Sequence, residues 1–245
     1  MIPVSITKIA DPNDKKLAVE VHKEMLGYMG DKSAPYPNRY AQDILQKAVS
    51  HRSIRDEIYV QLIKQLTNNP RPDSIVRGWH LLCMCVGIFP PVDFQLYLLH
   101  FLVERKEKGK GAVVDYAKFC LRALQSCMTR GDSTGFIPTV EEIAAYSARP
   151  PIVASIYMLD GSFVAEDLPM TPDLNVGTLL EMCKGWLNIK DPRFDTIGIF
   201  VEDLGDMDGV VIDEATRDAP YRKLPRTARP LRNEDFIGDI YVQVL

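Results

Sequence analysis

Apolar residues in the first 150 positions recur at the three- and four-residue spacing that is typical of helices. The segment 74–89 is apolar nearly all round, which indicates a central, buried helix with Trp79 inside the domain. Gly78 costs a helix about 1 kcal/mol relative to Ala, so it indicates a close approach of another helix beside Trp79. The other helical patterns cover 14–29, 44–49, 54–66, a segment starting at Phe94, 113–128 and a short segment after Thr139, where Glu142 completes a capping box. The pattern predicts an all-helical domain over 1–148.

The period changes after Arg149-Pro150-Pro151. Two strand-like runs, 152–159 and 162–170, flank an Asp-Gly pair, which is a strong hairpin signal. A helical pattern over 176–187 and an alternating run over 196–201 follow, while 236–244 fits either a helix or a strand. Hairpin, helix and strand in this order open a ubiquitin-like β-grasp. The predicted fold class is therefore multi-domain, α and α+β: a helical bundle, then a ubiquitin-like β-grasp lobe over 151–245.

Charge divides the chain in the same place. The whole sequence has a net charge of -4, but residues 1–150 carry 20 Lys and Arg against 16 Asp and Glu, and residues 151–245 carry 9 against 17. A basic half joined to an acidic half suggests two domains and an acidic partner for the first. No transmembrane segment or signal peptide is predicted, and the five cysteines are expected to be buried thiols of a cytoplasmic protein.

Catalytic patterns are weak in this sequence. Residues 131–135 fit G-x-S-x-G, but a helical pattern precedes Ser133 where that motif needs a strand, so we interpret it as a surface turn. The four histidines lack metal-ligand spacing. No catalytic, cofactor or metal site is predicted, and the module is not expected to be an enzyme.

Basic residues are the best candidates for partner binding, and they form two clusters. Aromatic residues do not alternate with them, so nucleic acid is not indicated as a partner. A solvated helix face paired with nearby carboxylates is the alternative for both clusters. The clusters consist of Arg52, Arg55, Lys64, Arg71 and Arg77, and of Arg105, Lys106, Lys108 and Lys110.

Two stretches carry a family resemblance: RDEIYVQLIKQLTNNP at 55–70 and RGWHLL at 77–82 resemble the signature of the myosin tail homology 4 domain. LGYMGD at 26–31 and CVGIFPP at 85–91 are also similar to that family. In the family this helical domain precedes a FERM module, whose first, ubiquitin-like lobe the residues after 151 resemble. The last strand of that lobe and the second and third FERM lobes do not appear here, so the third lobe's role in holding cargo peptides does not carry over.

The resemblance implies a non-catalytic module from the tail of a cytoskeletal motor, either an unconventional myosin or a plant-type calmodulin-binding kinesin. Its implied partners are microtubules, through the acidic tails of tubulin, and cargo or adaptor proteins; its implied location is the cytoskeleton. Any ATPase motor domain would lie elsewhere in the parent protein. The rival interpretation is the scaffold region of a signalling adaptor with lipid-binding or GTPase-regulating domains. Glu57 joins the nine basic residues as a candidate because it lies on a matching motif position with Arg55, Lys64 and Arg77, whereas Trp79 is expected to be structural.

Overall fold

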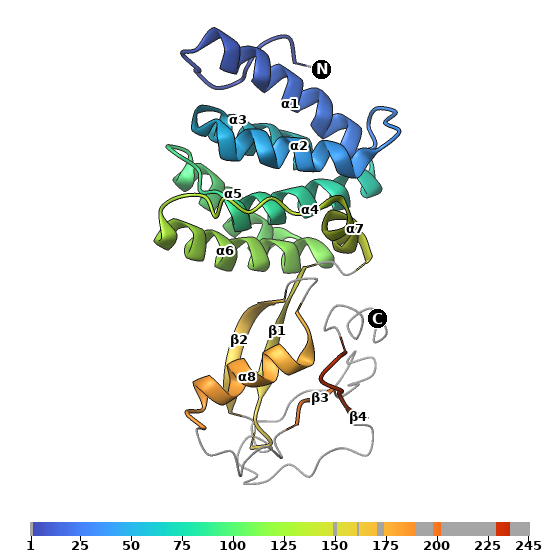
Figure 1. Cartoon of the computed structure of the whole chain (residues 1–245), viewed down its shortest axis with the longest axis vertical. Helices are drawn as coiled ribbons and strands as arrows, with labels where there is room; N and C mark the ends of the chain where they lie inside the picture. Colours follow the sequence, from blue (N-terminus) through green and yellow to red (C-terminus); the bar gives the residue numbers. More distant parts are fainter. Residues whose placement is uncertain are drawn as a thin grey trace. The chain divides into compact units, whose positions relative to one another are not determined.

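The structure is a computed structural model that describes residues 2–148, 151–160, 162–170, 174–189, 198–201 and 229–235 (Figure 1). Contacts between residues group the chain into two compact units, Met1–Val153 and Ala154–Leu245. The first unit is helical, and the second contains the described strands and one helix. The architecture is thus mostly helical with a small amount of sheet.

Stacked helices build the first unit (Figure 1). The outer helix α1 packs on α2 and α3, α4 packs on α6, and α7 lies against α2 and α4. The predicted all-helical character of this region is confirmed. The helices are α1 (Pro12–Met29), α2 (Pro37–Ser50), the 3-10 turn η1 (Arg52–Ile54), α3 (Arg55–Leu66), α4 (Pro72–Ile88), α5 (Gln95–Lys108), α6 (Ala112–Arg130) and α7 (Val140–Ala148).

Local capping explains where several helices begin and end. The Asp11 side chain accepts hydrogen bonds from the first backbone N–H groups of α1, and Gly30 ends that helix in the left-handed conformation that glycine adopts without strain. The predicted capping box at Thr139 and Glu142 is confirmed, since each side chain accepts from the other's backbone N–H, at 3.2 and 2.7 Å. One boundary was wrong. Helix α2 starts at Pro37, before the helical pattern expected over 44–49, because proline fits the first helical position, where no N–H is needed.

Helix α4 forms the centre of the first unit, as its pattern predicted. Trp79 is 2% exposed, and its ring stacks between Phe101 of α5 and Tyr116 of α6, with centroids 5.8 and 6.1 Å away. A Cβ on Gly78 would lie 2.8 Å from side-chain atoms of Leu66 and Met29. A larger residue would have to displace the ends of these two side chains, so glycine favours the close approach of α1 and α3.

The cysteines belong to the packed interiors of the two units rather than to a reactive site. All five are buried and unbridged, which confirms the predicted buried thiols. The Cys83 and Cys120 sulfur atoms lie 3.5 Å apart between α4 and α6. Burial raises the pKa of the Cys83 thiol well above its usual range, so the reactive thiolate is disfavoured.

The second unit has a hairpin as its clearest feature. Strands β1 (Ile152–Tyr157) and β2 (Phe163–Met170) pair around the predicted turn, where the Met158 N–H donates to the Ser162 carbonyl at 2.8 Å. Helix α8 (Val176–Trp186) follows, capped by the Asn175 side chain. Its first N–H groups donate to the carbonyls of Asn233 and Asp235. Strands β3 (Phe200–Val201) and β4 (Arg229–Pro230) form an antiparallel pair.

Some predictions for this unit fall outside the described residues. Of the strand expected over 196–201, the structure describes 198–201 and assigns β3 to the last two residues. The element expected over 236–244 lies entirely outside. Hairpin and helix follow in the predicted order, and the ubiquitin-like assignment stays a prediction.

Candidate partner-binding surface

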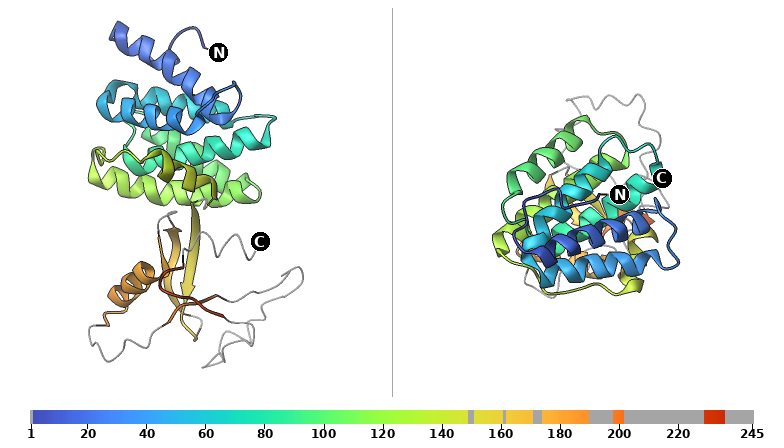
Figure 2. Two further views of the ribbon diagram at one scale, coloured as in Figure 1. Left: turned by 45° about the vertical axis from the view of Figure 1, so that its right-hand side comes forward. Right: turned by 90° about the horizontal axis from the view of Figure 1, so that it is seen from above.

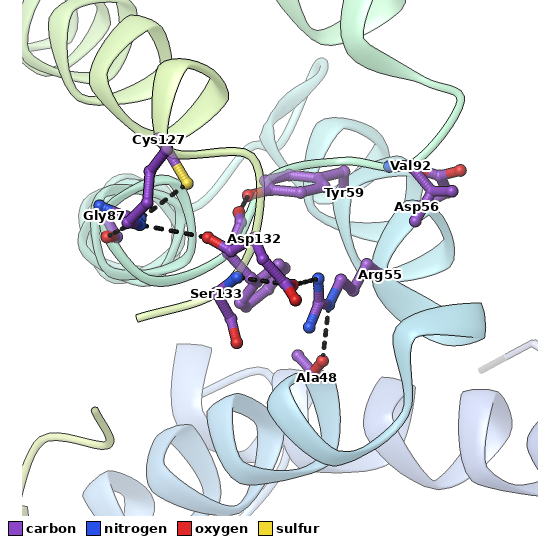
Figure 3. A network of polar contacts seen from close by, with 11 residues as sticks. Ala48, Arg55, Asp56, Tyr59, Gly87, Val92, Cys127, Asp132 and Ser133 are labelled. Carbon is purple, nitrogen blue, oxygen red and sulfur yellow. Dashed lines mark hydrogen bonds and ion pairs between the residues drawn. The ribbon is translucent and has the colours of Figure 1, made fainter. Parts of the chain in front are cut away.

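Arg55, at the start of α3, is an interior residue rather than a surface one. It is 3% exposed; its Nε donates to the Ala48 carbonyl at 2.9 Å and one terminal nitrogen donates to the Asp132 carboxylate at 3.0 Å (Figure 3). Its guanidinium also lies 5.8 Å from the centre of the Phe89 ring. The Ser133 N–H and, next, the Arg55 guanidinium hold the pKa of the Asp132 carboxyl below its usual range. Because Arg55 is buried and its bonds are made within the unit, its assignment to partner binding is corrected to a structural role.

The neighbours of Arg55 extend this network (Figure 3). The Tyr59 hydroxyl donates to the Phe89 carbonyl at 2.6 Å, which fixes the end of α4. Arg130, at the end of α6, donates to the Gly87 carbonyl at 3.2 Å. The Asp56 carboxylate accepts from the Val92 N–H at 2.7 Å and so positions the approach to α5. The bonds of Arg55, Asp56 and Tyr59 thus connect the start of α3 to the loops that follow α4 and α6.

Glu57 is the second candidate that the structure places inside. It is 0% exposed, and its carboxylate accepts from the Ile6 N–H, from the N–H and hydroxyl of Thr7, and from the Gln61 amide, at 2.6–2.8 Å. A buried carboxylate with four donors has no bonding capacity left for a partner. Its assignment is also corrected: Glu57 holds the segment before α1 against α3. The sequence could not show this, because three of the four donors, on Ile6 and Thr7, lie about fifty residues away.

The remaining residues of the first basic cluster do not form one patch. Arg71 pairs with Asp31 at 3.1 Å, and Arg77 donates to the Tyr28 carbonyl at 3.3 Å, near the end of α1. Both therefore stabilise the junction of α1 with α4, although each is exposed. Arg52 and Lys64 are exposed and, within the described residues, have no ion pair.

The second basic cluster lies at the end of α5. The Arg105 guanidinium stacks on the Phe101 ring at 5.1 Å, and Lys108 pairs with Glu104 at 3.3 Å, both on the same helix. That pairing lowers the pKa of the Glu104 carboxyl. Lys106 and Lys110 are exposed and enter no ion pair with the described residues. These two lysines are the best-placed cations of the cluster for an acidic partner.

Leu96, Leu99 and Val103 are exposed on the outer side of the same helix, and the sequence pattern did not single them out. They are 77%, 42% and 37% exposed. Tyr97, on the same helix, is also exposed, at 52%. The available signal was that α5 carries apolar residues on more than one face.

Catalytic and metal chemistry find little support in this geometry. Ser133 lies in the loop after α6, with its N–H bonded to the neighbouring Asp132 carboxylate at 2.7 Å. Among the residues that the structure describes, no group of three or more His, Cys, Asp or Glu could hold a metal ion. In the same part of the chain, no helix has the length and hydrophobicity needed to cross a membrane.

Comparison with known proteins identifies relatives of the helical unit. Residues 41–145 match the family model described as the MyTH4 domain. The high molecular weight form of myosin-1 from Acanthamoeba castellanii is 41% identical over 107 residues, which are 44% of this chain and 7% of that protein. Myosin-VIIa of Drosophila melanogaster is 37% identical over 120 residues, 49% of this chain and 5% of that protein. The chain thus spans a small part of the relatives that it matches.

Solved structures extend the likeness beyond the helices. The Dictyostelium discoideum myosin VII MyTH4-FERM MF1 domain is similar with a TM-score of 0.56 and 28% identity, over 75% of this chain and 38% of that one. A mutant of the same domain covers 99% of this chain and 46% of that one, with a TM-score of 0.57 and 23% identity, which shows a likeness in fold. The human myosin 7b C-terminal MyTH4-FERM domain, in complex with the harmonin-a PDZ3 domain, has a TM-score of 0.51 and 23% identity over 96% of this chain and 43% of that one.

Proposed function

We propose that this chain belongs to the tail of an unconventional myosin and binds microtubules. Residues 41–145, which match the MyTH4 family model, would form a non-catalytic binding module of that tail. In this proposal the MyTH4 domain spans 1–148, and residues 151–245 are the ubiquitin-like first lobe of a FERM module. The relatives reported above are myosins, which favours a myosin over a kinesin as the parent protein. A tail that binds microtubules would be associated with the cytoskeleton.

The observation that carries the microtubule proposal is the exposed basic end of α5. Lys106 and Lys110 are exposed and have no carboxylate partner among the described residues, within a region whose net charge is positive. Tubulin tails are acidic, so complementary charge would attract them to these lysines. Exposed charges are screened over about 8–10 Å at physiological salt, so the binding should be modest and sensitive to salt.

Co-sedimentation of the whole chain with microtubules tests this proposal. Lys106→Ala with Lys110→Ala should weaken binding about fivefold at low salt, since two exposed charge contacts are lost. Lys15→Ala with Lys16→Ala is the matched control, because both lysines are exposed on α1. The control should bind like the parent protein. Equal loss in both variants would indicate unspecific attraction by net charge, and absence of pelleting at low salt would reject microtubules as the partner.

Binding of a cargo or adaptor protein is the second candidate function. The human myosin 7b MyTH4-FERM structure was solved with a PDZ domain of harmonin-a, so a module of this fold can hold a protein partner. Pull-down of PDZ-containing proteins by the whole chain, together with failed microtubule binding, would favour this candidate. A signalling adaptor would give the same result. Sequencing of the full-length gene product would distinguish it from a myosin, because the two differ in their other domains.

A further inference from the structure

The outer face of α6 carries a polar hollow, which lies apart from the basic end of α5. Helix α6 lies at the end of the helix stack opposite α1, and it packs on α4 and α5 (Figure 2). The hollow is shallow and has a volume of about 570 Å³. Its lining consists of five exposed side chains of this one helix: Arg122, Gln125, Ser126, Thr129 and Arg130.

Helical spacing explains why these side chains gather. Arg122, Ser126 and Arg130 follow one another at intervals of four residues, and residues four apart are neighbours on a helix surface. With a rise of 1.5 Å per residue, the two arginines lie about 12 Å apart along the helix axis. Both line the same hollow, so one guanidinium stands on each side of the Ser126 hydroxyl.

Most of the polar groups in this hollow, the α6 hollow, remain available to a ligand. The side chains of Arg122, Gln125 and Ser126 form no hydrogen bond or ion pair with the described residues. The Thr129 hydroxyl is the exception, because it donates to the Gln125 carbonyl at 2.9 Å. The hollow therefore offers a guanidinium, an amide and a hydroxyl as free donors.

Arg130 adds a second guanidinium that is held in place. Its Nε donates to the Asp132 carbonyl at 3.1 Å, and its Nη2 donates to the Gly87 carbonyl at 3.2 Å. Both acceptors are uncharged, so they fix the side chain without neutralising it. No Asp or Glu occurs in the sequence between Asp115 and Asp132, and none lines the hollow. The hollow thus combines two positive charges with several donors.

We propose that the α6 hollow binds a phosphorylated serine or threonine side chain of a partner protein. A phosphate monoester carries a charge of about −1.5 to −2 at pH 7 and three strong acceptor oxygens, which arginine clusters recognise. Its oxygens can accept from Arg122, Arg130 and the Ser126 hydroxyl together. A carboxylate has two oxygens and a single charge, so it would use fewer of these donors. A membrane fits less well, because lipid-binding surfaces gather about four to eight basic residues, and two line this hollow.

A titration of the whole chain with a short peptide that carries one phosphoserine among alanines tests this inference. The backbone amide NMR signals of residues 122–130 should shift, and inorganic phosphate should compete with the peptide. Arg122→Gln should weaken peptide binding about tenfold, because charge-assisted hydrogen bonds to the phosphate are lost. Arg122 is exposed, so the variant should keep its fold, as a thermal melt will check.

Lys106→Ala with Lys110→Ala is the matched control for net charge. It removes two exposed charges from the same unit, outside the hollow, and should leave phosphopeptide binding unchanged. Arg122→Lys keeps the charge but lacks the planar fork of donors, so its binding should lie between those of the parent and Arg122→Gln.

Three results would overturn the inference. One is unchanged binding of the phosphopeptide by Arg122→Gln, and another is equally tight binding of the same peptide with aspartate in place of phosphoserine. The third is a phosphopeptide that leaves the signals of α6 unchanged; vesicles with phosphorylated inositol lipids that shift them instead would assign the hollow to a membrane. None of these measurements involves microtubules, so the proposed function and this inference can fail separately.

Discussion

Replacing Glu57 by Gln tests whether one buried carboxylate holds the segment before α1 in place. Its Oε1 accepts from the Ile6 N–H and the Gln61 amide, both at 2.8 Å, and its Oε2 accepts from the N–H and hydroxyl of Thr7, both at 2.6 Å. A glutamine side chain has one oxygen and one NH2 group, and the latter cannot accept. Either orientation of the amide therefore leaves one backbone N–H facing a donor.

The expected cost follows from the bonds lost. A hydrogen bond to a charged group contributes about 1.5–3 kcal/mol, and a buried donor left without an acceptor adds its own desolvation cost. We therefore expect Glu57→Gln to lower the free energy of unfolding by about 3–4 kcal/mol, which lowers Tm by roughly 10 °C in a chain of this size. Urea and thermal unfolding of the whole chain measure this. Glu141→Gln, at an exposed position on α7, is the matched control and should change stability by less than about 0.5 kcal/mol.

Deleting residues 2–10 completes the test as a double-mutant cycle. The deletion removes three of the four donors, so Glu57→Gln should cost far less in the shortened protein than in the whole chain. An equal cost in both backgrounds would show that the carboxylate does not act through this segment. If Glu57→Gln alone has a Tm within a degree or two of the parent, the four hydrogen bonds to Glu57 do not stabilise the fold as argued.

Three further predictions address the core, the pH response and the acidic unit. Trp79→Ala should lower the free energy of unfolding by about 3–5 kcal/mol in urea titrations, because it leaves a cavity between Phe101 and Tyr116. Burial lowers the pKa of His80 to about 4, so the unfolded chain binds the proton more readily and stability should fall as the pH drops from about 6.5 towards 4, by up to about 3 kcal/mol. His80→Gln should reduce that pH dependence, and an unchanged slope would contradict the assignment to His80. Residues 1–150 should pellet with microtubules more strongly than the whole chain, because residues 151–245 carry 9 basic against 17 acidic side chains; equal pelleting would mean that this charge does not affect binding.

Local patterns in the sequence were sufficient to predict most of the helical unit. The apolar run around Trp79 predicted the central helix, Gly78 predicted the close approach, and Thr139 with Glu142 predicted a helix start, because each signal lies within a few residues of its effect. The start of α2 at Pro37 was missed for the opposite reason. Proline marks loops and helix starts alike, and only the packing of α2 on α1 decides between them.

Candidate site residues were harder to predict because exposure is a tertiary property. Arg55 and Lys106 are both basic residues on amphipathic helices, yet one is buried against Ala48 and Phe89 and the other is exposed. Leu96 and Leu98 are likewise two leucines of one helix, and only the position of α6 makes the first exposed and the second buried. No local pattern contains that information.

The two signature stretches, 55–70 and 77–82, therefore determine how the domain folds rather than what it binds. Within them, Arg55 bonds to Ala48 and Asp132, Glu57 bonds to the segment before α1, and Trp79 fills the centre. The contacts of these residues are therefore made inside the unit. A surface that recognises another protein must instead lie where side chains remain uncovered once this network has formed. The end of α5 meets that condition, and it lies outside both signature stretches. Substitutions in the signature should accordingly lower stability before they alter partner choice, whereas substitutions on α5 should alter binding in a protein that melts like the parent.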